Sequence, residues 1–186
     1  MDPKEGESMD VSIREFLESD AKDLAHYAND KRIAAFIRDD FPQPYSVEDA
    51  ERFIKACLDR EHTNRIARAI CMDDKFIGTI SIVFNRQDDV YRKSAEIGYW
   101  LGVPFWGNGI MTSAIVYMCN LAFKYCNIER IYAETFEINT ASRRCLEKAG
   151  FTYEGTLRNH ICKYDVVQNS CMYSILRDEV PYLEGV

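Results

Sequence analysis

The chain has 186 residues, of which 47% are hydrophobic and 28% are charged, so it is long enough for one globular domain whose core needs no disulfide or metal. Its net charge of -7 argues against a nucleic-acid-binding protein, which needs clustered Lys and Arg, and would suit a cationic substrate such as an amine. No apolar run approaches the length of a membrane span, so we expect no contact with a membrane.

The first half of the chain predicts a strand, three helices and a hairpin. Residues 1–8 are polar and acidic, so we expect a flexible tail there and a single domain over 9–186. Ser46 and Asp49 form a capping box, the usual start of a helix. In chain order we predict a short strand from Val11, helices at 19–29, 33–37 and 46–58, and hairpin strands at 65–72 and 76–84.

The segment 94–125 changes its hydrophobic period in the middle. Its last part, from Met111 to Tyr125, has apolar residues every three or four positions, which predicts an amphipathic helix. A turn with Pro104, Gly107 and Gly109 precedes this helix. The first part alternates instead, which predicts a strand with Ala95, Ile97, Tyr99 and Leu101 on one face and Glu96, Gly98, Trp100 and Gly102 on the other.

The turn at Gly107 and Gly109 is a candidate anion-binding site. The first turn of a helix leaves its N–H groups unpaired at the positive end of the helix dipole, and glycines let a ligand approach the main chain. A phosphate or pyrophosphate would suit such a site, although a simple capping turn would need the same glycines. The spacing excludes a P-loop and a dinucleotide fingerprint, because Ile110 and Met111 replace Lys and Ser/Thr, and Thr112 replaces the third glycine.

The second half predicts further strands and one helix that complete a mixed α/β sheet. A Rossmann domain would open with a strand, a glycine loop and a helix, whereas here three antiparallel strands precede the glycine turn. The predicted elements are a strand at 130–136, a helix from 139 or 140 to 149 that Gly150 ends, and strands at 152–158 and 167–176, with loops at 85–93 and 159–166.

Two segments resemble the GNAT acetyltransferases, in the RimJ/RimL-like branch that modifies ribosomal-protein N-termini. EIGYWLGVPFWGNGIMTSA resembles the acyl-CoA motif of that branch, and RIYAETFEINTASRRCLEKAGF resembles its strand, Asn-x-x-Ser helix and Gly-Phe. The resemblance implies a GNAT-like α/β fold with a mixed, mostly antiparallel sheet of about six or seven strands, splayed in the middle and flanked by about four helices. It implies an N-acetyltransferase that moves an acetyl group from acetyl-CoA directly to a primary amine, either a protein N-terminus or a small amine.

The resemblance also implies which residues hold acetyl-CoA. The wider superfamily's loop reads Gln/Arg-x-x-Gly-x-Gly/Ala, and this chain departs from it with an aromatic residue at the first place, which is usual in this branch, and Met at the last. An N–H near the end of the strand would face the acyl oxygen. The residues expected to bind acetyl-CoA are Leu101, Gly102, Val103, Trp106, Gly107, Asn108, Gly109, Ile110, Met111, Thr112, Asn139 and Ser142.

The base for this reaction has two candidates. An alkyl amine has a pKa of about 10, so it must lose a proton before it attacks the thioester to form a tetrahedral intermediate. Glu96 shares its strand face with glycines, where a ligand can approach, but it could equally be a structural carboxylate held by a neighbouring strand. In related ribosomal enzymes the base lies in the loop after Gly-Phe, at 159–161 here, and His160 is the titratable residue at that place. A lone loop histidine can also be merely solvated.

The acid that protonates the departing thiolate is expected to be Ser142. Many GNAT enzymes use a tyrosine on this helix, but Leu146 occupies that position. In the RimJ/RimL-like pattern, Asn139 bonds the pantetheine amide and Ser142 takes over at the sulfur. Plain capping of the helix by Asn139 would need the same residue. Tyr173, on the final predicted strand, is a further candidate.

The remaining features concern the compartment and the rival functions. The seven cysteines are scattered without a Cys-x-x-Cys pair, and the N-terminus does not resemble a signal peptide, so we expect a cytoplasmic protein. The family resemblance implies a monomer or a homodimer. His160 and Cys162 have no further ligands nearby, so no metal site is expected. Because the common tyrosine is missing, a catalytically inactive acyl-CoA-binding sensor or scaffold is the alternative function. A nucleotide-binding domain of another type is the third.

Overall fold

The computed structural model describes residues 10–59, 64–85 and 89–183, so the predicted tail at 1–8 lies outside the described residues. Its helices are α1 (Ala21–Ala28), α2 (Lys31–Ala34), α3 (Val47–Leu58), α4 (Ile110–Tyr125) and α5 (Thr140–Lys148), with 3-10 turns at Glu18–Asp20 and Val103–Phe105. Its strands are β1 (Val11–Arg14), β2 (Arg65–Met72), β3 (Lys75–Phe84), β4 (Ser94–Leu101), β5 (Arg130–Phe136), β6 (Thr152–Lys163) and β7 (Val166–Leu176).

The strands form one seven-stranded sheet in the order β1-β2-β3-β4-β5-β7-β6. Neighbouring strands run antiparallel except β4 and β5, which are parallel because α4 crosses over between them. This confirms the mixed, mostly antiparallel sheet of the predicted GNAT-like α/β fold.

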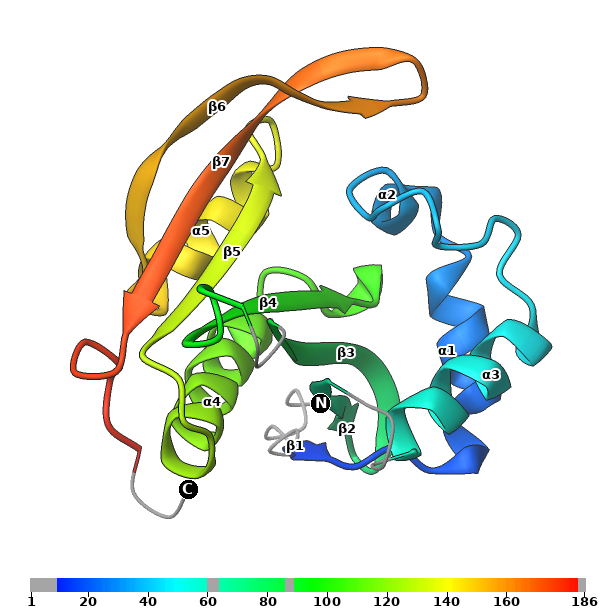
Figure 1. Cartoon of the computed structure of the whole chain (residues 1–186). Coiled ribbons are helices and arrows are strands. Elements are labelled where there is room, and N and C mark those ends of the chain that lie inside the picture. Colours follow the sequence, from blue (N-terminus) through cyan, green and yellow to red (C-terminus); the bar gives the residue numbers. More distant parts are fainter. Residues whose placement is uncertain (1–9, 60–63, 86–88, 184–186) are drawn as a thin grey trace, which may run out of the picture.

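The sheet is splayed in the middle, as predicted. The pairing of β4 with β5 covers only Ser94 to Glu96, opposite Arg130 to Tyr132. Beyond Glu96 the two strands continue without pairing, and Figure 1 shows them turning away from each other. The far half of β4 therefore presents a free backbone edge inside the molecule.

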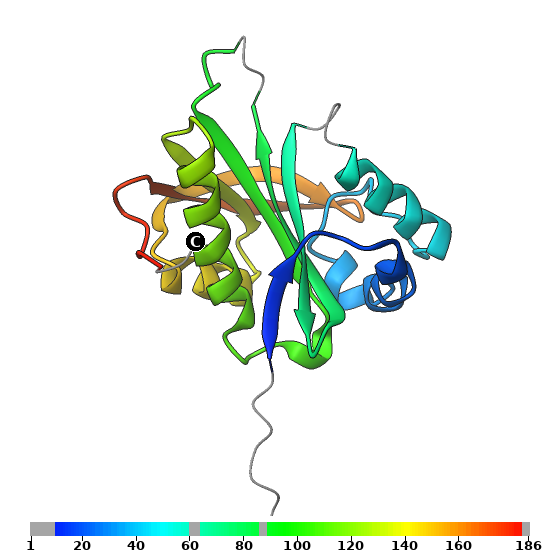
Figure 2. The same ribbon diagram turned by 90° about the horizontal axis from the view of Figure 1, so that it is seen from below.

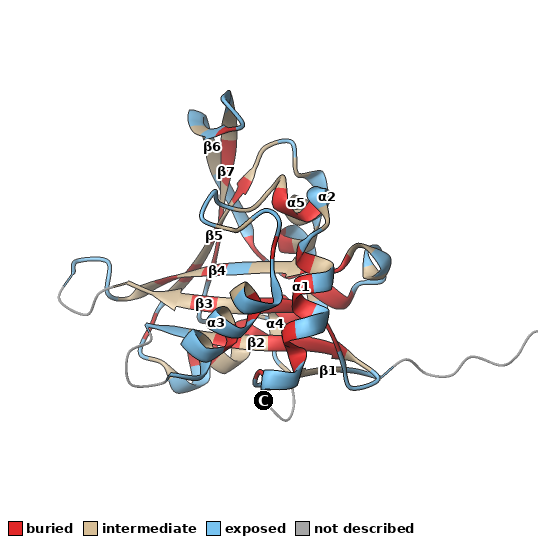
Figure 3. Ribbon diagram, turned by 90° about the vertical axis from the view of Figure 1, so that its right-hand side faces the viewer, coloured by how far each residue is buried: buried red, intermediate tan, exposed pale blue. Residues whose placement is uncertain are grey.

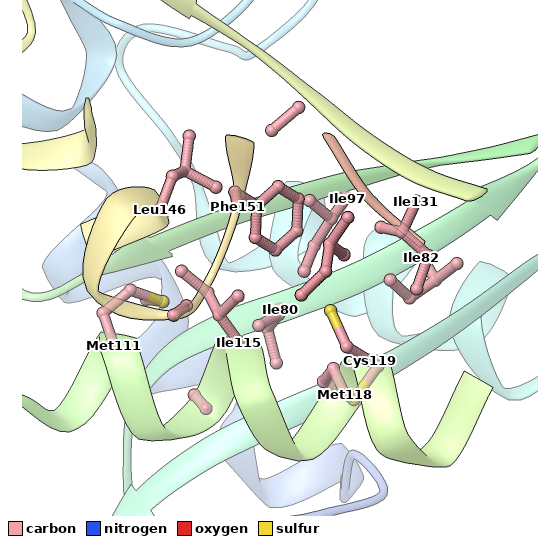
Figure 4. Packing of buried hydrophobic residues seen from close by; sticks show 14 of the residues in the cluster. Ile80, Ile82, Ile97, Met111, Ile115, Met118, Cys119, Ile131, Leu146 and Phe151 are labelled. Carbon is pink, nitrogen blue, oxygen red and sulfur yellow. The ribbon is translucent and has the colours of Figure 1, made fainter. Parts of the chain in front are cut away.

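Helices cover both faces of the sheet. Helices α4 and α5 lie on one face and α1 and α3 on the other, so two separate cores form (Figure 2). In the larger core, Ile80 and Ile97 of the sheet pack with Ile115 and Met118 of α4 (Figure 4). The helices turn their buried residues toward the sheet and their exposed residues outward (Figure 3).

Local sequence signals placed most elements correctly. The capping box of Ser46 and Asp49 is present at the start of α3. Asp73 and Asp74 both have positive φ angles, as a tight hairpin between β2 and β3 requires. Gly109 caps α4 with φ of +77°, a left-handed conformation that glycine adopts without strain.

Two predictions of extent were wrong. The second helix ends at Ala34 rather than 37, and its last predicted residues pack as a loop. The predicted loop at 159–166 is mostly strand, because β6 runs to Lys163 and turns at Tyr164 and Asp165. An irregularity between Leu157 and Ile161 breaks the alternation on which the prediction depended.

The second half of the sheet is cross-linked by Glu154. Its carboxylate accepts hydrogen bonds from Arg130 Nη1 at 2.6 Å and Ser174 Oγ at 2.7 Å, so it joins β6 to β5 and β7. The Arg130 guanidinium, and then the Ser174 hydroxyl, lower the pKa of Glu154 from its ordinary value near 4.5 to about 2.

We expect Glu154→Gln to destabilise the fold at neutral pH. A carboxyl with a lowered folded-state pKa adds stability above its unfolded pKa and loses it as the pH falls through the folded value. The side chain is 36% exposed, and water screens the pair, so the cost is about 1 kcal/mol. Urea unfolding should show the difference from the native protein at pH 6 and its loss between about pH 4.5 and pH 2. A difference that does not change with pH would contradict this assignment.

Candidate active site

A cavity of about 1070 Å³ passes through the gap between β4 and β5. Its walls come from the segment after α2, from β4, from the turn before α4, from the start of α5 and from β6. On β4, Tyr99 belongs to the face that packs on α4, whereas Glu96 belongs to the opposite face. The residues that line the cavity thus come from both faces of the sheet.

The turn before α4 supplies unpaired main-chain donors. Gly107 and Gly109 have positive φ angles, and a Cβ at either would meet nothing within 4 Å, so the backbone conformation is what favours glycine there. Within the described chain, the amides from Gly107 to Thr112 find no acceptor. The side chains of Ile110 and Met111 belong to the core, with 7% exposure each, so only their main chain serves a ligand.

The free edge of β4 supplies a second row of main-chain groups. The Gly102 amide donates to Ile77 O at 2.7 Å, and groups alternate along an antiparallel strand, so the amides of Tyr99 and Leu101 point the other way, into the gap. Trp106 Nε1 donates to Leu101 O at 2.7 Å and ties the turn back to the strand. The Leu101 amide remains directed at the gap, as expected for a contact with an acyl oxygen.

Gly102 and Val103 were expected to bind acetyl-CoA, but neither residue lines the cavity. Both groups of the Gly102 backbone are engaged, the amide by Ile77 and the carbonyl by the Phe105 amide at 3.0 Å. A Cβ at Gly102 would lie 3.0 Å from the ring of Tyr27. Packing of that ring, rather than a ligand, requires glycine here.

The start of α5 brings Asn139 and Ser142 to the cavity wall. Asn139 Oδ1 accepts the Ser142 amide at 3.1 Å, so Asn139 does cap the helix. Its amide nitrogen bonds to none of the described residues and is available to a ligand. Ser142 Oγ lies 2.9 Å from the hydroxyl of Tyr99, a contact between α5 and β4 that the sequence did not suggest.

His160 lies on β6, not in a loop, and has a carboxylate partner. Its Nδ1 is 2.8 Å from Glu134 Oε1 on β5 and 3.0 Å from Ser170 Oγ on β7. A carboxylate can only accept a hydrogen bond, so Nδ1 carries the hydrogen and Nε2 of the neutral ring can accept a proton. Glu134 went unnoticed in the sequence, because only the pairing of β5 with β7 brings its strand to β6.

Glu96 lines the same side of the cavity but is paired. Arg38 Nη2, from the segment after α2, lies 2.7 Å from Glu96 Oε1. The guanidinium of Arg38 therefore occupies one carboxylate oxygen of Glu96. The ion pair agrees with the alternative interpretation of Glu96 as a structural carboxylate. Its partner, however, is an arginine from the helical layer and not a residue of a neighbouring strand.

A model of the acetyltransferase (GNAT) domain matches residues 10–152. The chain belongs to the GNAT family. It is therefore an acyltransferase that moves an acetyl group to an amine.

Named relatives of this GNAT enzyme agree with that assignment. The uncharacterized N-acetyltransferase p20 of Bacillus licheniformis is 28% identical over 170 residues, which cover 91% of this chain and 94% of the relative. The ribosomal-protein-serine acetyltransferase of Escherichia coli is 29% identical over 109 residues, 59% of each protein. The structure of Mycobacterium smegmatis RimJ in complex with CoA-disulfide shares the fold, with a TM-score of 0.81 and 22% identity over 92% of this chain and 84% of that one.

The segment after α2 closes one side of the GNAT cavity. Phe36 packs edge-on against Phe136 of β5, with ring centroids 5.6 Å apart. Lys163, at the end of β6, donates to Ile37 O at 2.7 Å and to Asp39 Oδ1 at 2.6 Å. In Figure 1 the tip of the β6–β7 hairpin accordingly lies above α2. These contacts join the helical layer to the β5-β7-β6 half of the splayed sheet.

Tyr173 lies outside the GNAT cavity, whereas Trp100 is one of the residues that line it. Tyr173 is fully buried, and its hydroxyl bonds to Arg143 at 3.1 Å and Glu147 at 2.9 Å, so it does not line the cavity. Trp100 packs with Phe41 and Phe76 on the other face of β4.

Two structural features are absent from the described residues. Within this part of the chain, no helix is long and apolar enough to cross a membrane. Among the same residues, no group of three or more His, Cys, Asp or Glu side chains is placed to hold a metal ion.

Proposed function

We propose that this GNAT enzyme uses acetyl-CoA and transfers its acetyl group directly to a primary amine. The observation that carries the proposal is the pair of free main-chain rows at one cavity, one along β4 and one at the start of α4. Amides from Gly107 to Thr112 suit a pyrophosphate, because they lie at the positive end of the α4 dipole. The free edge of β4 and the amide of Asn139 suit the two amides of pantetheine.

His160 is the base in this proposal, and Glu134 orients it. Acetyl-CoA supplies the acetyl group as an activated thioester. With its Nδ1 hydrogen held by Glu134, the neutral imidazole of His160 can take a proton from an acceptor ammonium at Nε2. Glu96 is the less suitable candidate, since Arg38 already neutralises its charge.

The coenzyme side of the cavity supplies the remaining groups. The Leu101 amide, at the free edge of β4, can donate to the acyl oxygen as negative charge develops on it. Ser142 can donate its hydroxyl hydrogen toward the departing sulfur. These two donors lie on different elements, so only the folded chain brings them together.

The acceptor enters from the face of Glu96, Glu134 and His160. These carboxylates face basic residues as well, so the wall is not a purely acidic surface of the kind a polyamine would favour. We propose a primary amine as the acceptor, either a protein N-terminus or a small amine. The reaction takes place in the cytoplasm, with the protein as a monomer or homodimer.

An acetyl-transfer screen tests the proposal. The purified protein is incubated with acetyl-CoA and peptides with different N-termini, amino acids, polyamines and aminoglycosides. Release of free CoA is measured, and mass spectrometry identifies the acetylated product. We expect one added acetyl group on at least one amine. Binding of acetyl-CoA with no transfer to any acceptor class would overturn the proposal and favour a sensor.

A further inference from the structure

Tyr99 and Ser142 form a contact that no step so far requires. Tyr99 lies at the free edge of β4, where the sheet has opened, and its side chain reaches across to the first turn of α5. The two hydroxyl oxygens are 2.9 Å apart, and both residues line the cavity. Within the described chain this is the one hydrogen bond that the Tyr99 hydroxyl makes.

The surroundings of Tyr99 decide which hydroxyl donates. Burial raises the pKa of the Tyr99 phenol, and the neighbours that add to this effect are Cys145, Cys119 and Tyr173. The phenol therefore stays protonated at neutral pH. A phenol is a stronger acid than an aliphatic alcohol, so Tyr99 is the better donor and Ser142 Oγ the better acceptor. Ser142 then keeps its own hydrogen for another partner.

We propose that Tyr99 is a positioning residue, which holds Ser142 Oγ from behind and directs the Ser142 hydrogen into the cavity, toward the sulfur of CoA. This inference rests on the proposed function, in which Ser142 donates to that sulfur. By itself, a serine hydroxyl in the first turn of a helix can rotate and bond to the backbone carbonyl three or four residues earlier in the chain. The bond from Tyr99 favours the rotamer that faces the gap.

Neither hydroxyl gives up its proton to the departing thiolate, because an aliphatic alcohol is an even weaker acid than a phenol. Ser142 stabilises the thiolate by a hydrogen bond. A thiol has an ordinary pKa of about 8.5 and a phenol one of about 10, so a thiolate does not remove the phenol's proton efficiently. Burial increases this difference for Tyr99. Tyr99 consequently keeps its hydrogen throughout, and its effect passes only through Ser142.

The first measurement is a double-mutant cycle with Tyr99→Phe and Ser142→Ala. We expect Ser142→Ala to lower kcat about 10- to 100-fold and Tyr99→Phe about 5- to 10-fold, with little change in the KM for acetyl-CoA. In the Ser142→Ala background, Tyr99→Phe should cause no further loss, because the serine through which it acts is gone. Tyr117→Phe is the matched control, since Tyr117 packs on the same core from α4 but does not line the cavity.

The second measurement needs no turnover. The pKa of the thiol of bound CoA is followed by the ultraviolet absorbance of its thiolate. A donor aimed at the sulfur stabilises the thiolate, so Ser142→Ala should raise this pKa by about one unit. Tyr99→Phe should raise it by a smaller amount, and Tyr117→Phe should not change it. Thermal melting of each variant confirms that it is folded.

The possible outcomes separate this inference from the proposed function. Equal losses of kcat from Tyr99→Phe in both backgrounds would overturn the positioning role and indicate a structural one. The role is also overturned if Ser142→Ala raises the thiol pKa while Tyr99→Phe does not. If Ser142→Ala itself changes neither kcat nor the thiol pKa, the assignment of Ser142 as donor is wrong, and the inference fails with it.

Discussion

His160→Ala is expected to lower kcat/KM about 100-fold or more, the usual loss when a general base is removed. The expectation depends on the geometry at the acceptor face, where Glu134 holds Nδ1 at 2.8 Å and leaves Nε2 as the proton acceptor. Steady-state kinetics with the acceptor found in the screen measures the loss. Because the variant leaves space at residue 160, free imidazole in the buffer should restore part of the rate.

The pH dependence of the variant adds an independent check. Without a base, the reaction needs an amine that is already deprotonated, so the rate of His160→Ala should continue to rise with pH toward the pKa of the acceptor, about 8 for a protein N-terminus and about 10 for an alkyl amine. The native enzyme should level off at a lower pH. Glu96→Gln is the matched comparison, since Arg38 pairs with Glu96. A larger loss from Glu96→Gln than from His160→Ala would reverse the assignment of the base.

Asn108→Asp should weaken the binding of CoA strongly while removing only one long, exposed hydrogen bond of the fold, from Asn108 Nδ2 to Phe105 O at 3.4 Å. Asn108 is exposed between Gly107 and Gly109, and the change places a carboxylate of the same shape beside the unpaired amides. Two like charges about 5 Å apart repel by about 1 to 3 kcal/mol near a protein surface. The dissociation constant for CoA, measured by isothermal titration calorimetry, should rise about 5- to 150-fold.

Two controls show whether charge at this turn is the cause. Asn127→Asp adds the same charge at an exposed residue after the far end of α4 and should leave CoA binding unchanged. Added salt should reduce the difference between Asn108→Asp and the native protein, because it screens exposed charges. Unaltered affinity of Asn108→Asp at low salt would show that the pyrophosphate does not bind at this turn.

Local sequence patterns were enough to locate the strand, the turn and the helices that carry the proposed coenzyme side of the site. The change from period two to a helical period between Ser94 and Tyr125 marks a strand, a turn and a helix, and the structure has all three. Asn139 and Ser142 are three residues apart at a helix start, so their common orientation follows from helix geometry. Where a local pattern was irregular, as at Asn159 with its positive φ, the prediction ended the strand too early.

The side-chain pairs that form between distant elements around the cavity could not be predicted in the same way. Three hydrogen bonds join residues that are far apart in the sequence. They connect His160 with Glu134 (26 positions), Tyr99 with Ser142 (43 positions) and Arg38 with Glu96 (58 positions). Such pairs depend on which strands become neighbours and on where β4 leaves β5.

The sequence alone determined the elements and the glycine turn, because hydrophobic period, capping and backbone conformation are properties of adjacent residues. Only the tertiary structure decided which histidine has a carboxylate partner and which serine forms a hydrogen bond with a tyrosine. Strand register and the opening of the sheet set those distances, and both result from packing across the whole core rather than from any one segment.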